Sequence, residues 1–519
     1  MAKITKVYLM NTLLEKDYKH TMYFESAAAQ QQYFQKRIQS AMTFTDFVYQ
    51  RKDQVIRIPK HIDSLYAAKV NYCMYQNTEY SNKWFYAFIT DMKYINDGCT
   101  EVYIKTDCMQ TWMFDITIKH SFVEREHATS DGIGEHTVPE GLELGEYYCI
   151  GSEKVTELTD CKYVIFATEG VSDNKTYATS VGGIPYAGGA YVCETLAELV
   201  SIINLFANDT KTDSIYAVYM IPSKIIEDND EYMSFSGQGD PVKFTKKILT
   251  PNSVNGYVPK NKKLLTFPFS YLLLSNNAGT SNVLKYELFN NSVADGCEFQ
   301  ISGIPVVGGS IKCCPKRYNG VAVNQEEGVM CGKFPTLSWS ADMFTNWLTQ
   351  NSVNIALGIG AGAVQIVGGI ATIAATSGAG AAIGGASVVG GVTAIANTLA
   401  QVHTQSFTPD SARGNTNGGD INTADGENTF YFYKMSIKAE FARIIDEYFN
   451  MFGYKCDRVK VPEKNHRENY WYTKTIDANI VGGIPQDDLQ TIKDCYNNGI
   501  TFWKNESYYR NYSVSNNIV

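Results

Sequence analysis

The sequence predicts a mainly β protein with some α-helix and one inserted apolar hairpin. Only 19% of the 519 residues are charged, while tyrosine (35 residues) and glycine (41 residues) are abundant. This composition favours strands and tight turns over helical bundles. Short alternating segments bounded by Asn, Asp and Gly recur along the chain. A long charge-free stretch, rich in glycine and alanine, interrupts the pattern.

The N-terminal region carries the clearest strand patterns. Strands are expected at residues 6–10, 21–24, 50–59, 84–89 and 100–106. In the third segment the alternation places Ile56 and Ile58 on one side, as in a half-buried strand. Asn96-Asp97-Gly98 is a turn sequence, so it should join the last two segments into a hairpin. Together these segments indicate a meander or a barrel.

The rest of the chain adds strands and two helices. Further strands are expected at residues 215–221, 271–275, 283–289 and 431–433. A helix over residues 197–207 should cover a sheet or a barrel end, because its apolar residues recur at helical spacing: Leu199, Ile202, Ile203 and Phe206. A second amphipathic helix is predicted over residues 439–451, with its apolar face formed by Phe441, Ile444, Ile445, Tyr448 and Phe449.

The charge-free stretch runs from Met343 to Pro409 and contains no Asp, Glu, Lys or Arg. Surface helices of soluble domains carry a polar face, so this stretch must lie inside protein, inside lipid, or in each in turn. Two arms, residues 353–375 and 379–400, flank a turn-like segment at 376–380. Each arm has the roughly 20 residues that cross a bilayer, so the hairpin could span a membrane.

The arms do not have the composition of an ordinary membrane anchor. The eleven glycines of residues 353–400, of which Gly378 lies between the two arms, would cost isolated helices in water on the order of 10 kcal/mol. Small residues let helix backbones approach closely and suit a segment that changes environment. We interpret the hairpin as a conditional membrane segment; a buried helical hairpin in a large core is the alternative. Its membrane-inserting residues are predicted to be Val353, Ile355, Leu357, Ile359, Val364, Ile366, Val367, Ile370, Ile373, Ile383, Val388, Val389, Val392, Ile395 and Leu399.

Charge and cysteine content restrict the partners and the compartment. The net charge of −9 argues against a protein that grips nucleic acid by its phosphates, which requires clustered Lys and Arg. A surface with this net negative charge would repel DNA, and a protein that conducts DNA through a channel could benefit from that repulsion. The first twenty residues lack the apolar core of a secretion signal, so we expect folding in a cytoplasm. Twelve cysteines without CxxC pairs should be reduced thiols.

The sequence shows no catalytic or metal-binding motif to which a reaction can be assigned. The glycine-rich match at 358–363 lacks a preceding strand and a following acidic residue, so it does not indicate a dinucleotide site. His120, His127 and His136 lack the spacing of a zinc site. The charges at 124–126 favour an ion-paired strand face over acid–base or carbohydrate chemistry. The abundant tyrosines suit subunit interfaces but also admit glycan stacking. We expect no enzyme, no cofactor and no metal.

Several blocks of sequence carry a resemblance to a known family. They are DCMQTWMFD at 107–115, SFVEREH at 121–127, GYVPKNKKL at 256–264, FPF at 267–269 with the strand to Ser275, residues 334–342, residues 467–472 and GITFW at 499–503. In this order they resemble the tail knob, or distal tail tube, proteins of small short-tailed bacteriophages. The blocks cover both ends and the middle of the chain, although none is a catalytic fingerprint.

The resemblance implies a structural virion protein with barrel-like tail-tube domains that assembles as a homohexamer at the tail tip. Its apolar loops would plug the lumen and, on infection, enter the host cytoplasmic membrane to form a pore for genome ejection. Partners would be other tail proteins, this membrane and viral DNA passing through the lumen without specific binding. The subunit would be assembled in the host cytoplasm. The alternatives are a stand-alone membrane-active pore-forming toxin and, third, a wall-degrading enzyme.

The expected domain division follows the chain in four parts. Residues 1–155 would form an N-terminal β-barrel-like tube domain, and residues 156–335 a second β-rich domain with a covering helix. Residues 336–410 would hold the apolar hairpin insertion. Residues 411–519 would complete the tube body, because chain on both sides of the hairpin returns to the same body.

Overall fold

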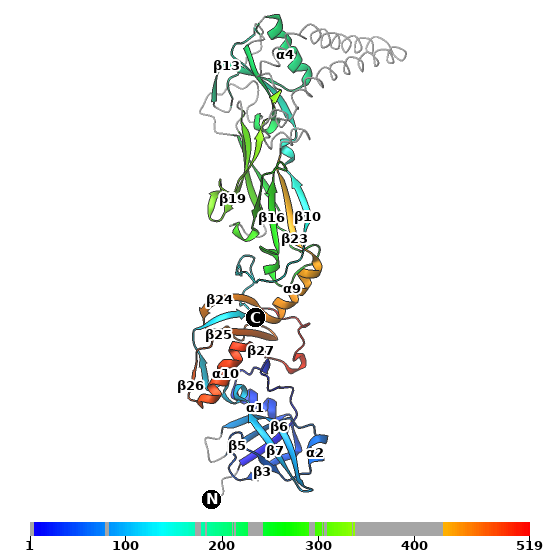
Figure 1. Ribbon diagram of the computed structural model, residues 1–519, viewed down its shortest axis with the longest axis vertical. Coiled ribbons are helices and arrows are strands. Elements are labelled where there is room, and N and C mark those ends of the chain that lie inside the picture. The colour runs from blue at the N-terminus through cyan, green and yellow to red at the C-terminus, as the bar shows by residue number, and fades with distance from the viewer. Residues whose placement is uncertain are drawn as a thin grey trace, which may run out of the picture. The chain divides into compact units, whose positions relative to one another are not determined.

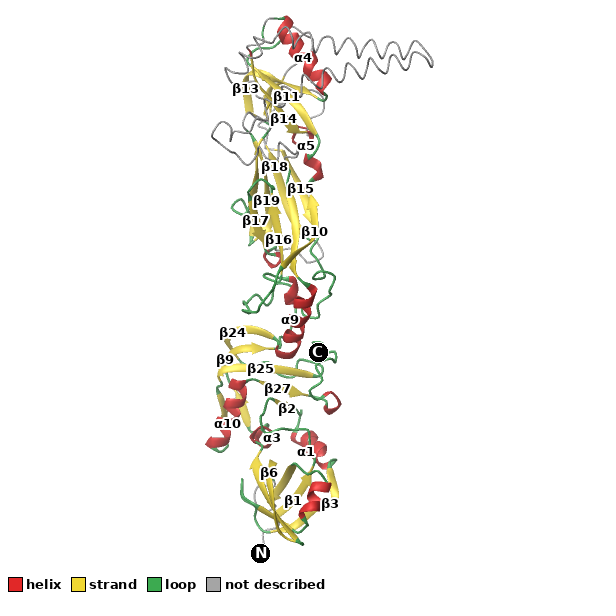
Figure 2. Ribbon diagram, turned by 45° about the vertical axis from the view of Figure 1, so that its right-hand side comes forward, coloured by secondary structure: helices red, strands yellow, loops and turns green. Residues whose placement is uncertain are grey.

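A computed structural model describes the larger part of the chain, as two compact units. Unit 1 comprises Met1–Gly145, Gly256–Leu264 and Lys438–Val519, and unit 2 comprises Glu146–Asn255 and Leu265–Ile437. The described residues are 5–77, 83–171, 178–181, 184–209, 211, 214–226, 242–289, 296–303, 305, 309–334, 336–337 and 429–519. The mainly β architecture predicted from the sequence is confirmed (Figures 1 and 2).

The first sheet of unit 1 is a half-barrel of six antiparallel strands in the order β3-β1-β5-β6-β7-β4. Among the described residues β3 and β4 remain its two edges, so it is not closed. Helices α1 (Ala27–Gln35) and α2 (Ile62–Ala67) belong to the same region. The strands are β1 (Thr5–Met10), β3 (Ile38–Phe47), β4 (Ile56–Ile58), β5 (Tyr72–Asn77), β6 (Trp84–Asn96) and β7 (Cys99–Thr106).

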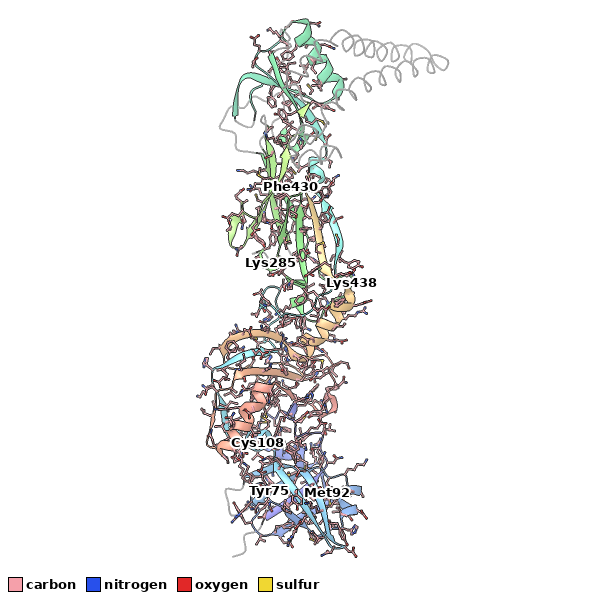
Figure 3. All side chains as sticks on the ribbon, in the orientation of Figure 1. Tyr75, Met92, Cys108, Lys285, Phe430 and Lys438 are labelled. Carbon is pink, nitrogen blue, oxygen red and sulfur yellow. The ribbon has the colours of Figure 1, made fainter. Side chains whose placement is uncertain are left out.

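Both faces of this sheet are covered. Alternate residues of β1 enter different cores: Val7 and Leu9 pack on one face, and Met10 packs on the other. The same division holds in β5, where Tyr75 belongs to the first core and Tyr72 to the second (Figure 3 labels Tyr75). Residues on both faces of β5 are buried, which explains why Tyr72–Tyr75 show no alternation of apolar and polar residues.

The second sheet of unit 1 has the order β2-β27-β25-β9-β24 and draws its strands from both ends of the chain. β2 runs parallel to β27, and the other pairs are antiparallel. Helices α3 (Cys108–Trp112), α9 (Ala439–Phe452) and α10 (Gln486–Asn498) lie in the same unit. The strands are β2 (His20–Met22), β9 (Ser121–Glu126), β24 (Tyr454–Lys460), β25 (Tyr470–Asp477), β27 (Ile500–Trp503) and the separate pair β8 (Ile116–Ile118) and β26 (Ile480–Gly482).

Unit 2 contains two sheets that pack face to face. One has the order β10-β23-β16-β17, and the other has the order β15-β18-β19-β20, with β21 also paired to β19. Phe432 of the first sheet meets Phe299 of the second with ring centroids 4.5 Å apart, inside one shared core. The strands are β10 (Tyr147–Lys154), β23 (Tyr431–Ile437), β16 (Ser270–Ser275), β17 (Ser281–Leu284), β15 (Val242–Ile248), β18 (Cys297–Gly303), β19 (Ser310–Tyr318), β20 (Val321–Val323) and β21 (Val329–Lys333).

The third sheet of unit 2 has the order β12-β13-β11-β14-β22. Helix α4 (Leu196–Asn208) covers one face, where Ile202 and Phe206 are buried against Ile165 of β11 (Figure 1). The predicted covering helix is therefore confirmed. The other elements of unit 2 are β11 (Cys161–Ala167), β12 (Ala178–Val181), β13 (Ile184–Cys193), β14 (Ile215–Pro222), β22 (Thr336–Leu337), α5 (Ser223–Ile226) and the 3-10 helices Thr156–Leu158 and Tyr286–Leu288. Two further 3-10 helices are Glu506–Tyr508 in unit 1 and Lys262–Leu265, which begins in unit 1.

Two local expectations are corrected. Within 50–59 only Ile56–Ile58 is a strand, because the chain turns at Asp53, which has a positive φ of 55° and accepts a hydrogen bond from the Thr106 amide. Helix α9 lies where it was predicted, but Ile444 is 65% exposed and Asp446 is only 1% exposed. Its buried face is therefore rotated from the predicted one.

The predicted apolar hairpin, with its fifteen membrane-inserting residues from Val353 to Leu399, lies outside the described residues. No helix among the residues that the structure describes has the length and apolar character needed to span a bilayer. The division into four consecutive domains stays a prediction.

Candidate functional site

Most of the sequence blocks quoted above meet in unit 1. The blocks at 107–115, 121–127, 256–264, 467–472 and 499–503 come from its three separate chain segments. They supply α3, strands β9, β25 and β27, and the loop before β16. Blocks that are far apart in the sequence therefore lie in one compact unit. The hydrogen-bond and ion-pair partners of their polar residues show what each residue does.

The first block begins with a buried carboxylate that fixes helix α3. The Asp107 carboxylate accepts hydrogen bonds from the Gln110 amide (3.0 Å) and from the Tyr72 hydroxyl (2.8 Å). The first of these is an N-terminal helix cap, which satisfies an otherwise unpaired amide. Burial raises the pKa of Asp107 to about 6. Asp107 therefore joins α3 to the half-barrel sheet.

Gln110 and Trp112 extend these connections. The side-chain Nε2 of Gln110 donates to the Thr21 hydroxyl and to the Met22 carbonyl, each at 2.8 Å. These two hydrogen bonds hold β2 against α3. Trp112 donates from Nε1 to the carboxylate of Asp488 in α10 at 2.8 Å. All these groups are buried, where a hydrogen bond that is left unmade costs about 1–3 kcal/mol. The first block therefore links α3 to β2, β5 and α10 through buried hydrogen bonds.

The charges at 124–126 form ion pairs, as predicted. Glu124 pairs with Lys474 of β25 at 2.8 Å, and Glu126 pairs with Lys460 of β24. Arg125 pairs with Glu140. Because each carboxylate of this block has a lysine partner, the geometry is that of a cross-strand network, not of an acid–base pair. Arg125 and Glu126 are also buried, which the sequence did not indicate.

Glu140 is the centre of a buried ion cluster. Its carboxylate binds both Arg125 and Lys263, and the side chains of all three residues are at most 8% exposed. Arg125 also donates to the Gly453 carbonyl at 2.6 Å and lies over the Tyr448 ring. Burial lowers the pKa of Lys263, whereas the charge of Glu140 acts in the opposite direction. Two buried cations thus depend on one carboxylate.

A second buried carboxylate, Asp446 of α9, holds the block at 256–264. It accepts hydrogen bonds from the Tyr257 hydroxyl (2.7 Å), the Lys260 amide (2.8 Å) and the Asn261 amide (3.0 Å). The Asn261 side chain adds a fourth at 2.8 Å. A carboxylate that meets four donors is well compensated for its burial. The loop therefore takes its conformation from one residue of a distant segment.

His127 is a buried residue of the second block. Its Nδ1 accepts a hydrogen bond from the Tyr472 amide at 2.8 Å, so its Nε2 carries the proton toward the Asn450 carbonyl at 3.1 Å. Burial lowers the pKa of His127 to about 3, and neighbouring Arg467 adds to this. The described residues contain no group of side chains that could hold a metal ion. His127 is a neutral structural residue.

Acidification should therefore weaken unit 1 through His127. Below about pH 6.5 the unfolded chain binds a proton at this site while the folded chain does not, down to about pH 3. The unfolding free energy of the native chain minus that of the His127→Gln variant should therefore fall by about 1.4 kcal/mol for each pH unit in this window. Urea unfolding of both proteins at several pH values measures this, with His120→Gln at an exposed position as control. A difference independent of pH would contradict the assignment.

The sequence did not reveal Asp446, Glu140 or Asp488 as organising residues. The only local signal for Asp446 is a carboxylate placed between apolar residues of an amphipathic helix, and Glu140 has no distinguishing neighbours at all. The membrane-inserting residues predicted between Val353 and Leu399 lie outside the described residues. The twelve cysteines are free thiols, eight of them buried.

Comparisons with known proteins agree with the order of the blocks. The family model of the C-terminal domain of tail knob protein gp9 of Bacillus phage phi29 matches residues 236–517, which is more than half of the chain. The caudoviral major tail protein N-terminus matches residues 3–118. Tail knob protein gp9 of Bacillus phage phi29 is 27% identical, and that of Bacillus phage B103 is 25% identical, over 98% and 95% of both chains respectively.

A solved structure shares the fold. The tail knob protein gp12 of bacteriophage C1 superposes with a TM-score of 0.65 over 99% of this chain and 100% of its own, at 15% identity. Together these matches define a structural tail protein of a short-tailed bacteriophage. The chain belongs to the family of the phi29 tail knob protein gp9, C-terminal domain.

Proposed function

We propose that this chain forms the distal tail tube as a ring of six copies, whose apolar hairpins plug the lumen and later enter the host cytoplasmic membrane. The observation that carries the proposal is the charge-free stretch from Met343 to Pro409 inside a member of the tail knob family. On infection the inserted hairpins would form a channel for the genome. Family membership supports this function over that of a toxin acting alone.

The physical basis is an exchange between two apolar environments. Copies packed around one axis would remove the apolar surface of each hairpin from water, which contributes about 25 cal/mol per Å². A bilayer offers the same surface a second favourable environment. The glycines and alanines, about half of the two arms, permit close packing in the plug and do not commit the segment to lipid. A trigger therefore needs only to expose the tip of the hairpin.

The charge of the chain fits passage of DNA. A net charge of −9 gives no general attraction for phosphates, so DNA would move through the lumen without specific binding. Contacts with other tail proteins would place the subunit at the tail tip after assembly in the host cytoplasm. In this proposal the strands of neighbouring copies would form the tube wall, and the hairpins would close and open it.

Deleting residues 353–400 tests the proposal. We expect the shortened chain to assemble into rings visible by electron microscopy, and to release at least about tenfold less dye from liposomes than the intact chain, because no apolar hairpin remains to insert. Deletion of the polar segment 411–422 serves as a matched control, since it leaves both apolar arms intact. Leakage that persists in the hairpin deletion would exclude the membrane role, and an intact chain that forms no ring would exclude the tube.

A further inference from the structure

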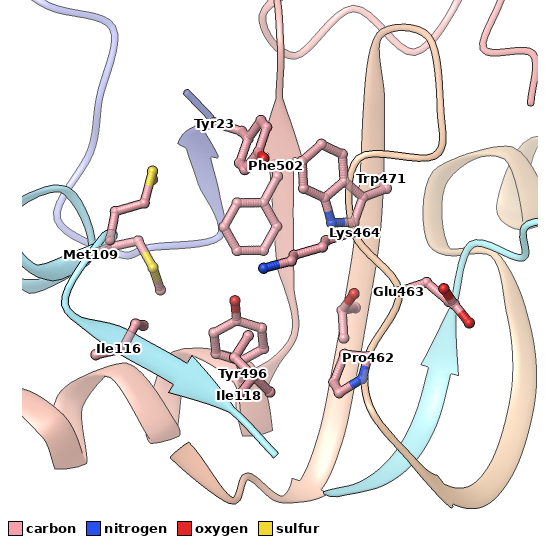
Figure 4. A pocket seen from close by; sticks show the side chains of 12 residues that line it. Tyr23, Met109, Ile116, Ile118, Pro462, Glu463, Lys464, Trp471, Tyr496 and Phe502 are labelled. Carbon is pink, nitrogen blue, oxygen red and sulfur yellow. The ribbon is translucent and has the colours of Figure 1, made fainter. Parts of the chain in front are cut away.

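A small pocket of about 70 Å³ opens in unit 1 beside β8, β25, β27 and α10 (Figure 4). Its walls include the rings of Trp471, Phe502 and Tyr496 and the thioether of Met109. Trp471 and Phe502 are stacked, with ring centroids 5.2 Å apart, and both belong to the core of unit 1. The walls are therefore held rigidly by core packing, which suits a preformed binding site.

Two side chains in these walls present a hydrogen-bond donor to the pocket. Tyr496 is 6% exposed and Trp471 is 2% exposed. Neither the Tyr496 hydroxyl nor the Trp471 Nε1 has a hydrogen-bond acceptor among the residues that the structure describes, and Figure 4 shows the hydroxyl pointing into the pocket. Burial raises the pKa of Tyr496, so its hydroxyl stays protonated and can donate. Because both donor atoms are open to the pocket, a ligand with acceptor oxygens can accept a hydrogen bond from each of them.

A cation reaches into the same space. The Lys464 side chain extends into the pocket toward the Tyr496 hydroxyl (Figure 4), and within the described part of the chain it has no ion-pair partner. The adjacent Glu463 carboxylate is already bound by Lys460 at 2.8 Å. Two neutral donors and one cation thus converge on a pocket that offers no free carboxylate of its own. This electrostatic arrangement selects an anion with acceptor oxygens.

From this arrangement we infer that the pocket binds the carboxylate of a sugar acid. Its volume is about half of the ~150 Å³ that encloses a benzene molecule, so only the acidic edge of one ring can enter. The carboxylate would accept from Tyr496 and Trp471 and would pair with Lys464. The apolar CH groups of the ring would contact Phe502 and Met109. Free sugar acids and terminal acidic sugars of a surface glycan share this chemistry, and the site does not depend on the apolar hairpin.

The test is calorimetric titration of the full chain with D-glucuronate, with neutral methyl glucoside as the matched ligand. We expect saturable binding of glucuronate and at least about tenfold weaker binding of the glucoside. Tyr496→Phe removes one hydroxyl without changing the ring, and Lys464→Met removes the charge, so each should weaken glucuronate binding by about tenfold. Tyr508→Phe and Lys16→Met, at exposed positions of unit 1, should bind as the native chain does.

Three results would overturn the inference: no saturable binding of glucuronate up to about 20 mM, equal binding of the neutral glucoside, or unchanged binding in both pocket variants. The circular dichroism spectrum of Tyr496→Phe should match that of the native chain, so weaker binding by this variant would come from the lost hydroxyl and not from unfolding. Titration with an oligosaccharide that ends in glucuronate distinguishes a free sugar acid from the acidic terminus of a surface glycan. If it binds as tightly as the monosaccharide, the site accepts a glycan terminus; if only the monosaccharide binds, the site takes the free acid. Both results support a carboxylate site.

Discussion

Glu140→Gln is expected to destabilise unit 1 by about 3–5 kcal/mol, because it leaves the buried cations of Arg125 and Lys263 without their shared carboxylate. The glutamine has nearly the same shape, so the loss isolates the charge. Urea unfolding followed by tryptophan fluorescence measures the change. The signal reports mainly on unit 1, because four of the six tryptophans lie there: Trp84, Trp112, Trp471 and Trp503.

Two further variants make this expectation specific. Glu143→Gln changes an exposed carboxylate of the same segment and should alter the unfolding free energy by less than about 0.5 kcal/mol. Replacing Arg125, Glu140 and Lys263 together by Met, Leu and Met should recover much of the lost stability, since a buried ion cluster and a well-packed apolar group of similar volume are often equivalent. A single Glu140→Gln change of under about 1 kcal/mol would show that the cluster does not carry the stability of unit 1.

Asp446→Ala is expected to release the loop at 256–264 and to lower the unfolding free energy by about 3 kcal/mol, because four donors lose a charged acceptor. The loop contains Lys260, Lys262 and Lys263, so limited trypsin digestion reports on it directly. Cleavage there should become at least about tenfold faster than in the native chain.

The neighbouring residue provides the comparison for Asp446. Glu447→Ala alters an exposed carboxylate one position along α9 and should leave the cleavage rate unchanged. Tyr257→Phe removes a single donor and should cost about 1 kcal/mol. Equal protease sensitivity of the Asp446 and Glu447 variants would show that the loop is held by something other than this carboxylate.

Elements whose partners are near in the chain could be predicted from the sequence. The β6 and β7 hairpin follows from alternation and from the turn at Asn96-Asp97-Gly98, both of which act locally. The parallel pairing of β2 with β27 could not be predicted, because it joins His20 to Thr501 and no local pattern encodes it. For the same reason, the assembly of unit 1 from three chain segments was not visible.

The candidate site was predicted less well than the fold. Helical spacing identified α9, but its apolar residues cover more than half of the helix circumference, so the spacing fits more than one buried face. Ile444 was therefore assigned to the core, and the buried role of Asp446 was missed. The block at 107–115 was recognised as a family signal, yet the functions of Gln110 and Trp112 follow only from partners far away in sequence.

The strand order of the second sheet bears on how the molecule is made. β27, at residues 500–503, lies between β2 and β25, so the middle of this sheet is among the last segments that the ribosome delivers. Until then His20–Met22 has no neighbour on that side, and Trp503 is missing from the aromatic core. Nascent chains must therefore keep an unfinished sheet from pairing with one another, and a message truncated shortly before codon 500 should yield an aggregating product, not a shortened but folded subunit.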